Sequence, residues 1–312
     1  MPSACFPIQR TAVGGLLTFA FLFLFTSFGN ADSTAISVSD FMKIRCNSGG
    51  QSTLTTWHGN VTTTGVGSEK SRTVFKISGF NIARCQQNET GEWTVTSREM
   101  TFYLDPVSGE VLRSWLNPWT NETVPVVHIA NALVQQKISS STNLTAESAG
   151  ETALLRIDVP LSYPNELSKD SRFADYSPES TYKAHESFTY VFARKDLDAL
   201  SRVNSIAGVQ VSWTRVSPWL PWMKMKGAGG HLVFNAIVRK HDDVGSLPQF
   251  FKNEIAQSDS ALYLDAPRCI VKGRPNVSSW TYFKEHFEEY LAQSVFPRPE
   301  PAALAADECR VP

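Results

Sequence analysis

Short stretches in which apolar and polar residues alternate dominate the chain between Gln51 and Ala130. They are rich in Thr, Val, Phe and Trp, and alternation with period two is typical of half-buried strands. Turn-forming segments such as "QQNETGEW", "DPVSGE" and "NPWTNE" interrupt them at short intervals. Consecutive strands joined by tight turns pair antiparallel. The pattern therefore predicts a β-meander in this part of the chain.

The same alternation continues after a small, polar segment over residues 139–150. Strands are predicted in "TALLRIDVPLSYPN", "SFTYVFARK", "VQVSWTRV" and "HLVFNAIVRK". Residues 165–186 show no regular period and are expected to form an irregular segment with one short helical turn. Two helices are predicted, over residues 247–258 and 283–293, and the second places Phe283, Phe287, Tyr290 and Leu291 on one stripe.

These elements predict a mainly β fold: an antiparallel, barrel-like (calycin-like) sheet with a few peripheral helices. A β-sandwich is the alternative arrangement for the same strands. We expect a single domain over residues 32–312 that ends in an extended tail rich in Pro and Ala. A closed or nearly closed barrel removes exposed strand edges and leaves room for one small ligand.

The first 31 residues have the pattern of a secretory signal peptide. Arg10 precedes an apolar run over residues 12–28, and the small residues Gly29 and Ala31 follow it. The alternative is a retained membrane anchor, although the run is short for a span of about 20 residues. We therefore expect cleavage, no stable membrane anchor afterwards, and a mature protein in the secretory pathway or outside the cell.

Cysteine and asparagine positions fit that compartment. Beyond Cys5, four cysteines remain, and an even number in a secreted chain favours disulfides. Three pairings are possible; Cys46 with Cys85 and Cys269 with Cys309 is favoured because each pair closes a moderate loop. Five Asn-x-Ser/Thr triplets are candidate glycosylation sites: Asn60, Asn88, Asn121, Asn143 and Asn276.

Charge and motifs exclude several classes of function. The 29 basic and 30 acidic residues nearly balance, and no basic stripe indicates a nucleic-acid partner. The chain has no G-x-S-x-G elbow, phosphate loop, H-E-x-x-H motif or dinucleotide fingerprint. We therefore expect neither a metal nor a cofactor. A cofactor-independent reaction or simple binding of a small hydrophobic organic molecule is favoured, and the oligomeric state stays open.

Arg215 is the first candidate functional residue. In "VQVSWTRV" the alternation places Val209, Val211, Trp213 and Arg215 on one strand face. A guanidinium on an apolar face needs either an ionic partner or a wet cavity, because an unpaired buried charge costs several kcal/mol. Arg215 is thus either part of a structural ion pair or a ligand-binding group.

The segment "TRVSPWLPWMKMKGAGG" follows, and it concentrates Trp219, Trp222, Met223 and Met225 between prolines and glycines. Trp and Met together form a large, adaptable apolar wall. Three interpretations are open: the segment lines the mouth of the barrel, it lies on a membrane surface, or it fills the barrel end as core. The two prolines and the lack of helical periodicity disfavour the membrane.

Two further groups complete the candidates. In the meander, a barrel would bring several of seven residues into one interior: Trp57, His58, Arg98, Tyr103, Trp115, Trp119 and His128. Arg98 repeats the pattern of Arg215, since it shares a face with Met100 and Phe102. Ahead of the last helix, "GRPNVSSWTYFK" supplies Arg274, Trp280, Tyr282 and Lys284. A histidine in a strand is more often a satisfied core residue than a base.

Four stretches of the chain resemble a family of bacterial and fungal proteins, commonly secreted, that is catalogued as a domain of unknown function. They are "REMTFYLDPVSGEVLRSWLNPWTNETVPVVHIAN", "VSWTRVSPWLPWMKM", "LYLDAP" and "RPNVSSWTYFK". The chain departs from the family pattern at Trp119 and Asn121, where Tyr and Gly are usual, and over residues 226–230, where Arg-Pro-Gly is common. Both departures fall in loops.

More loosely, the chain is similar in length and character to fungal hetero-Diels-Alderases of tropolone sesquiterpenoid (meroterpenoid) biosynthesis. That resemblance implies a reaction in secondary metabolism that joins an ortho-quinone methide, formed from a hydroxymethyl tropolone or phenol by loss of water, to a humulene-type olefin. It needs no cofactor, because positioning of two apolar reactants supplies much of the rate, roughly 7–11 kcal/mol in favourable cases.

Under this hypothesis each candidate has a role. Arg215, Arg98, Tyr103 or Tyr282 would bond to the quinone methide oxygen, and His58 or His128 would assist the dehydration. The substrate-binding walls would be Trp57, His58, Trp115, Trp213, Trp219, Trp222, Met223, Met225 and Trp280. The alternatives are a lipocalin-like secreted binding protein without catalysis and, less favoured, an unrecognised hydrolase.

Overall fold

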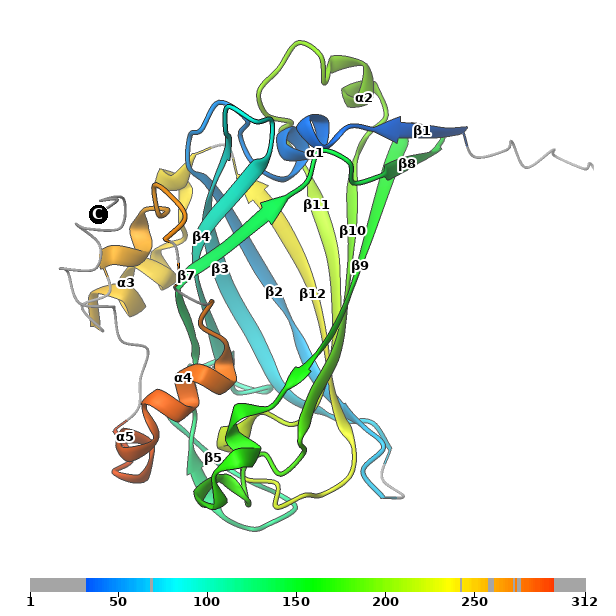
Figure 1. Ribbon diagram of the computed structural model, residues 1–312. Helices are drawn as coiled ribbons and strands as arrows, with labels where there is room; N and C mark the ends of the chain where they lie inside the picture. The colour runs from blue at the N-terminus through cyan, green and yellow to red at the C-terminus, as the bar shows by residue number, and fades with distance from the viewer. Residues whose placement is uncertain are drawn as a thin grey trace, which may run out of the picture. The chain divides into compact units, whose positions relative to one another are not determined.

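The computed structural model describes residues 32–67, 70–241, 243–257, 261–271, 273 and 276–294. The predicted signal peptide, Cys309 and the tail from residue 297 lie outside these ranges. Ten strands form one antiparallel sheet in the order β1-β8-β9-β10-β11-β12-β2-β3-β4-β7 (Figure 1). They are β1 (Asp32–Ile36), β2 (Thr53–Thr64), β3 (Thr73–Gln87), β4 (Trp93–Leu104), β7 (Ile129–Ile138), β8 (Leu144–Ala149), β9 (Thr152–Pro164), β10 (Thr181–Ala193), β11 (Gln210–Ser217) and β12 (His231–His241).

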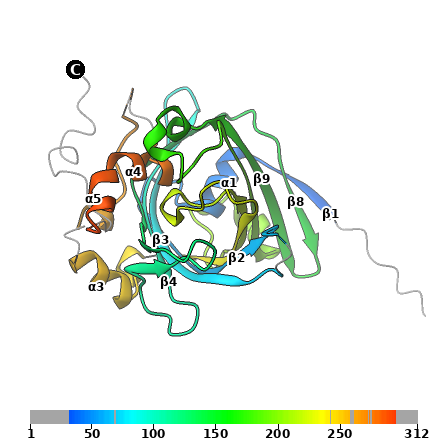
Figure 2. The same cartoon turned by 90° about the horizontal axis from the view of Figure 1, so that it is seen from below.

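The sheet curls into a half-barrel, seen from below in Figure 2. Long strands paired in simple register produce it: β9 and β10 pair from Thr152 opposite Ala193 to Pro164 opposite Thr181. The right-handed twist of such strands bends a wide sheet round on itself. The predicted fold class is confirmed: the protein is mainly β, with a barrel-like antiparallel sheet and few helices. A small second sheet pairs β5 (Ser114–Leu116) with β6 (Thr123–Pro125).

One end of the half-barrel is filled by α1 (Val38–Arg45), a helix that the sequence pattern did not predict. Ser37 caps it by accepting a hydrogen bond from the backbone N of Asp40 at 3.0 Å. Its buried residues join an apolar cluster with inward-facing residues of β4, β9, β10 and β11 (Figures 1 and 2). At its C-terminal end, the Lys240 ammonium donates to the carbonyls of Ile44 and Cys46 at 3.1 and 2.6 Å. A cation there satisfies carbonyls that have no partner within the helix.

Helices cover the outer face of β3 and β4, which explains why β4 is buried on both sides. They are α3 (Gln249–Gln257) and η5 (Ala261–Leu264); α4 (Ser279–Glu285) contacts β7 instead, and α5 (Phe287–Leu291) follows it at the end of the half-barrel, where Tyr290 donates to the Trp222 carbonyl. Phe80 and Phe102 on the outer face contact Phe251 of α3, with ring centroids 5.2 and 6.3 Å apart. The remaining short helices are α2 (Lys195–Ala199), η1 (Glu166–Lys169), η2 (Ser171–Phe173), η3 (Pro221–Met223) and η4 (Val244–Ser246).

Two predicted elements differ from the structure. The single helix expected over residues 283–293 is two helices that meet at His286, and the first begins at Ser279 behind a Ser278 cap. Leu291 is exposed and not part of the buried stripe. The irregular segment before β10 contains two short 3-10 helices, η1 and η2, where one turn was expected. Among the described helices, none has the length and apolar character needed to cross a membrane.

Candidate functional site

Polar side chains gather on the concave face of the sheet, between the apolar cluster around α1 and a second one at the opposite end. Arg215 on β11 lies opposite Glu186 on β10 in the strand register. Their side chains form an ion pair with Nη1 and Oε1 3.1 Å apart, and they keep 21% and 17% of their surface accessible. Arg215 therefore points inward, as the alternation predicts, and it has both the ionic partner and the contact with water that a buried guanidinium requires.

Tyr182 on β10 extends this group toward the end of the barrel. Its hydroxyl accepts a hydrogen bond from the guanidinium of Arg215. Its ring stacks on Tyr163, with centroids 4.7 Å apart, and packs edge-on against Trp280 at 4.6 Å. Burial raises the pKa of the Tyr182 hydroxyl and raises that of Tyr163 to about 12, so both phenols are neutral near pH 7.

Glu99 stands on the opposite wall, in a row of polar residues across three strands. It lies opposite Asn81 of β3 on one side and opposite Asn131 of β7 on the other. Asn131 Nδ2 donates a hydrogen bond to Glu99 Oε1, and the Asn81 side chain makes another. Burial is the main cause of a raised pKa for Glu99; Glu186 adds to it, and Arg215 opposes it. The carboxyl of Glu99 is thus biased toward its protonated form.

Several hydrogen-bond donors in and around this interior have no partner within the described residues. They are Trp57 Nε1, Tyr103 Oη, Trp213 Nε1, Arg215 Nε and Trp222 Nε1. Tyr103 and Trp222 are 0% and 1% exposed, and Trp57 is 9% exposed. A buried donor without a partner costs about 1–3 kcal/mol. Trp57 lies flat on the inner wall because β3 has Gly79 there: a Cβ at Gly79 would be 2.4 Å from the indole ring.

The Trp-Met segment fills the second end of the half-barrel. Trp222 and Met223 lie in η3 and are 1% and 0% exposed. Trp222 contacts Tyr103 and Phe75, with ring centroids 5.5 and 5.6 Å apart. The backbone of the segment is fixed by Asn117 Nδ2, which donates to the Met223 carbonyl at 2.8 Å. Of the three interpretations, packing as the core of the barrel end describes Trp222 and Met223.

A cavity of about 430 Å³ lies beside the Trp-Met segment, between residues 176–183 and residues 225–231. Trp219, Met225 and Trp280 line it together with Tyr182. The indole nitrogens of Trp219 and Trp280 donate to the Ala228 carbonyl and to Ser177 Oγ, both at 3.0 Å. Tyr182 therefore separates this end cavity from Arg215 in the interior.

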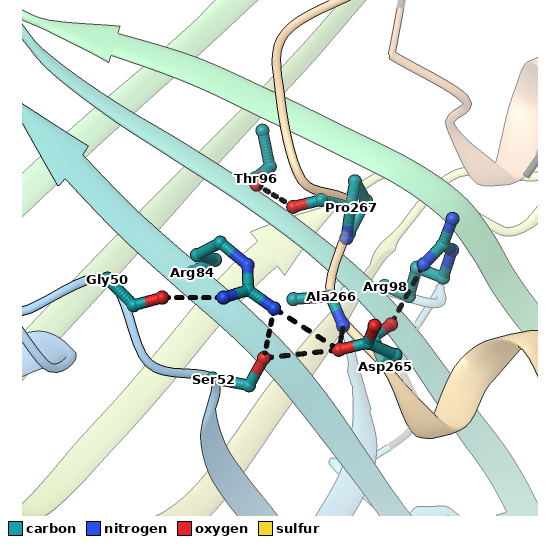
Figure 3. Close-up of polar contacts among 8 residues, drawn as sticks. All are labelled: Gly50, Ser52, Arg84, Thr96, Arg98, Asp265, Ala266 and Pro267. Carbon is teal, nitrogen blue, oxygen red and sulfur yellow. Dashed lines mark hydrogen bonds and ion pairs between the residues drawn. The ribbon is translucent and has the colours of Figure 1, made fainter. Parts of the chain in front are cut away.

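Arg98 does not point into the interior, and the prediction that it shares an inner surface with the other meander residues is wrong in this respect. It lies on the outer face of β4, where Nη1 donates to the Asp265 carbonyl at 2.9 Å (Figure 3). On the same face, Arg84 contacts the Asp265 carboxylate at 3.3 Å, and Thr96 donates to the Pro267 carbonyl at 2.6 Å. These contacts fasten the "LYLDAP" segment over β3 and β4. Strand periodicity separates the two faces of β4 but does not say which one looks inward, because both faces of this strand are buried.

The two candidate histidines differ in position. His128 is 1% exposed, and its Nδ1 accepts a hydrogen bond from the backbone N of Tyr103 at 3.1 Å. Burial lowers the pKa of His128 to about 3, with a further contribution from Arg113, so its imidazole is neutral and joins two chain segments. His58 lies on the outer face of β2, exposed, with Nδ1 2.9 Å from Ser78 Oγ.

The remaining candidates lie in different parts of the structure, and Trp115 and Trp119 are at the end of the half-barrel. Trp115 of β5 packs against Phe75 at 5.3 Å, and Trp119 packs against Trp219 at 5.2 Å. Tyr282 is buried in α4, with its ring 4.3 Å from that of His286. Arg274 lies outside the described residues. Trp213, by contrast, faces the interior beside Arg215 and contacts Phe234 at 5.9 Å.

The disulfide prediction is confirmed for Cys46 and Cys85, whose Cα atoms are 6.1 Å apart. The second predicted pair includes Cys309, which lies outside the described residues. All five candidate glycosylation sites are exposed: Asn60, Asn88, Asn121, Asn143 and Asn276. Asn276 differs, because its Nδ2 donates to the Gln135 carbonyl at 3.0 Å and its Oδ1 accepts from the Gln135 backbone N at 2.7 Å.

Sequence reasoning missed Glu186, Glu99 and Tyr182. Glu186 was missed because residues 165–186 were expected to be irregular, whereas β10 begins at Thr181 and places Glu186 on one strand face with Phe188 and Tyr190. Glu99 could not be identified from the sequence, because its neighbours Arg98 and Met100, on the other face of β4, are also buried. The register shift between β4 and β7 next to Glu99 also has no signature in the sequence.

Comparison with known proteins gives one family and no named relative. None of the curated proteins matches the chain. A family model matches residues 50–287, which include β2 to β12, η3, α3 and α4, and therefore all of the interior residues described above. The match covers most of the chain, and the protein belongs to the family described as "Protein of unknown function (DUF1838)".

Proposed function

We propose that the interior of the half-barrel binds a small, largely apolar organic molecule through an acceptor oxygen. The observation that carries this proposal is the group of buried donors without partners, Trp57 Nε1, Tyr103 Oη, Trp213 Nε1 and Arg215 Nε. Each of these groups can donate a hydrogen bond, so an acceptor oxygen on a ligand would satisfy them. The indole faces supply the apolar contact area that such pockets need.

Arg215 is the centre of this site. Its guanidinium is already positioned by Glu186 and Tyr182, so little side-chain freedom is lost when a ligand binds. A charge-assisted hydrogen bond to a ligand oxygen contributes about 1.5–3 kcal/mol. The pair Arg215–Glu186 is close to neutral as a unit, which favours a polarised neutral oxygen, such as a ketone or a tropolone oxygen, over a strong anion.

A ligand titration tests the proposal. Tropolone is a suitable probe, and cycloheptatriene is the matched control because it has the same ring without oxygen. We expect tropolone to quench tryptophan fluorescence saturably and cycloheptatriene to bind at least tenfold more weakly. Arg215→Ala should weaken tropolone binding by tenfold or more. Arg156→Ala is the control variant, because Arg156 forms an ion pair on the exposed outer face at 2.9 Å. Equal affinities of the two variants would contradict the proposal.

A second candidate function is catalysis at the same site, as a cofactor-independent hetero-Diels-Alderase acting on an ortho-quinone methide tropolone or phenol and a humulene-type terpene. The observation that favours it is that Arg215, Tyr182 and Tyr103 interact with one another electrostatically, which places two neutral phenols near one guanidinium. Donors aimed at a quinone methide oxygen stabilise the negative charge that develops there in the transition state.

The two candidates differ in what Arg215 contributes. If the protein catalyses the cycloaddition, Arg215→Ala should reduce product formation far more than tropolone affinity. Trp222→Ala should reduce both and alter the stereochemical outcome, because Trp222 packs directly on Tyr103. Small, equal losses in both variants would support a carrier without catalysis.

We also propose that the protein matures in the secretory pathway. The Cys46–Cys85 disulfide supports an oxidising compartment, and exposed Asn-x-Ser/Thr sites support access to glycosylation enzymes. Mass spectrometry of protein purified from its native host should find an N-terminus near Asp32 and glycans on some of these sites. An intact N-terminus with reduced Cys46 and Cys85 would contradict this proposal.

A further inference from the structure

Two carboxyl groups face the interior from opposite walls, and they are in different electrostatic settings. Glu186 is paired with Arg215 at 3.1 Å. Glu99 has no ion pair within the described residues; its hydrogen-bonding neighbours are the uncharged amides of Asn131 and Asn81. A pair of acids in contrasting environments is the arrangement that allows one group to donate a proton while the other accepts one.

Glu99 is held firmly in this position. Its neighbours in register, Asn81 on β3 and Asn131 on β7, contact it from both adjacent strands, so the carboxyl cannot turn away from the interior without losing both contacts. Asn131 Oδ1 is itself buried without a partner within the described residues. The groups that bear on Glu99 electrostatically from across the interior are Glu186 and Arg215.

We propose that Glu99 is the general acid of the interior site and protonates a departing hydroxyl group of the bound molecule. This inference rests on the proposed binding function and on the quinone methide chemistry of the second candidate function; the substrate is an aromatic or tropolone ring with a hydroxymethyl group next to a ring hydroxyl. Neither Glu99 nor Glu186 belongs to a motif with a known role; their roles are assigned from the partners that hold each carboxyl, an ion pair for Glu186 and neutral amides for Glu99.

The step balances without a cofactor. The ring hydroxyl gives its proton to the carboxylate of Glu186, and Arg215 stabilises the ring oxygen. The electron pair of that oxygen moves into the ring, the bond between the hydroxymethyl carbon and its oxygen breaks, and Glu99 gives its proton to the leaving oxygen. The products are water and an ortho-quinone methide. Glu186 then returns its proton through solvent to Glu99, which restores both groups.

Oxygen exchange tests this step without a second reactant. Addition of water to the quinone methide reverses the reaction, so in ¹⁸O-labelled water the hydroxymethyl group of 2-(hydroxymethyl)phenol becomes labelled, as mass spectrometry detects. We expect the wild-type protein to accelerate labelling over buffer. Glu99→Gln keeps the shape and hydrogen-bonding capacity but cannot supply the proton, and it should slow protein-dependent labelling at least tenfold, since general acids contribute about 10²–10⁴-fold.

Controls separate this role from a structural one. Tropolone affinity of Glu99→Gln should stay within threefold of wild type, and Glu166→Gln, on an exposed carboxylate paired with Lys169, should label like wild type. The wild-type labelling rate should fall as pH rises through the raised pKa of Glu99, because only the protonated acid acts. This pH dependence is measured on the wild-type protein, so it tests the role of Glu99 even if Glu99→Gln does not fold.

The outcomes distinguish the inference from the function beneath it. Unchanged labelling in folded Glu99→Gln, or a wild-type rate that rises with pH, overturns the role of Glu99. A wild-type protein that binds tropolone but does not accelerate labelling overturns this inference and leaves the binding function intact. Absence of tropolone binding overturns the proposed function, and the role of Glu99 is lost with it.

Discussion

Acidification should destabilise the protein through His128, and the structure sets the size of the effect. His128 is buried at the edge of the sheet, and its Nδ1 accepts the backbone hydrogen bond of Tyr103. Burial and the nearby charge of Arg113 lower its pKa from 6.5 to about 3. The folded state therefore holds His128 neutral, whereas the unfolded chain takes up a proton near its ordinary pKa.

The sign follows from this difference in proton binding. Because the folded pKa is depressed, the contribution of His128 to stability is complete above pH 6.5 and is lost as the pH falls from 6.5 toward 3. Each pH unit in this window costs about 1.4 kcal/mol. Between pH 8 and pH 5 the free energy of unfolding should fall by about 2 kcal/mol from this residue alone, since pH 5 is about 1.5 units below the unfolded pKa.

Urea denaturation at several pH values measures this loss, and His128→Asn is the matched variant. The Asn oxygen can accept the hydrogen bond from Tyr103 in place of Nδ1, but the side chain does not titrate. At pH 8 the variant should be less stable than wild type, because the smaller side chain leaves a cavity. Its free energy of unfolding should nevertheless fall about 2 kcal/mol less than that of wild type between pH 8 and pH 5. Parallel pH profiles would refute the assignment of His128 as a buried neutral residue.

Two further substitutions test what holds the interior walls. Gly79→Ala places a Cβ within 2.4 Å of the Trp57 indole, and it should cost about 1–3 kcal/mol in urea denaturation and weaken tropolone binding. Gly229→Ala is the control, since the nearest atom to its Cβ is 3.9 Å away, and it should be nearly neutral. Cys46→Ser with Cys85→Ser opens a loop of 39 residues and should lower the free energy of unfolding by about 4 kcal/mol. A reducing agent should lower the free energy of unfolding of wild type by a similar amount and leave that of the double variant unchanged. An equal effect of the reducing agent on both proteins would contradict the prediction.

The candidate site differs from the two packed ends of the half-barrel in the polarity of its side chains. The two ends of the half-barrel are packed with Phe, Trp, Ile and Met, and they are closed by α1 and by η3. Between them the interior has carboxyls, amides and a guanidinium that are partly accessible, such as Glu186 and Arg215. Retaining such groups in an interior costs free energy unless they are paired or used. This contrast is the physical basis for placing function in the middle of the barrel.

The helical layer shows how the convex face became closed to ligands. Arg98 and Arg84 project from that face, yet both are engaged by the segment around Asp265 (Figure 3). A cation on an apolar strand face is thus not sufficient to identify a site. Arg215 and Arg98 have the same local pattern, and only the position of α3 and η5 separates an interior group from one that fastens a covering segment.

The sequence by itself determined the strands, their turns and the antiparallel fold, because alternation and turn residues act over a few neighbours in the chain. It also identified the inward face of β11, where Arg215 interrupts a run of apolar residues. Only the tertiary structure decided which face of β4 looks inward, since helices bury its other face equally well. It also brought Glu99 into range of Glu186 and Arg215 from strands distant in sequence. Contacts across a curled sheet depend on register and curvature, and no short stretch of sequence encodes either one.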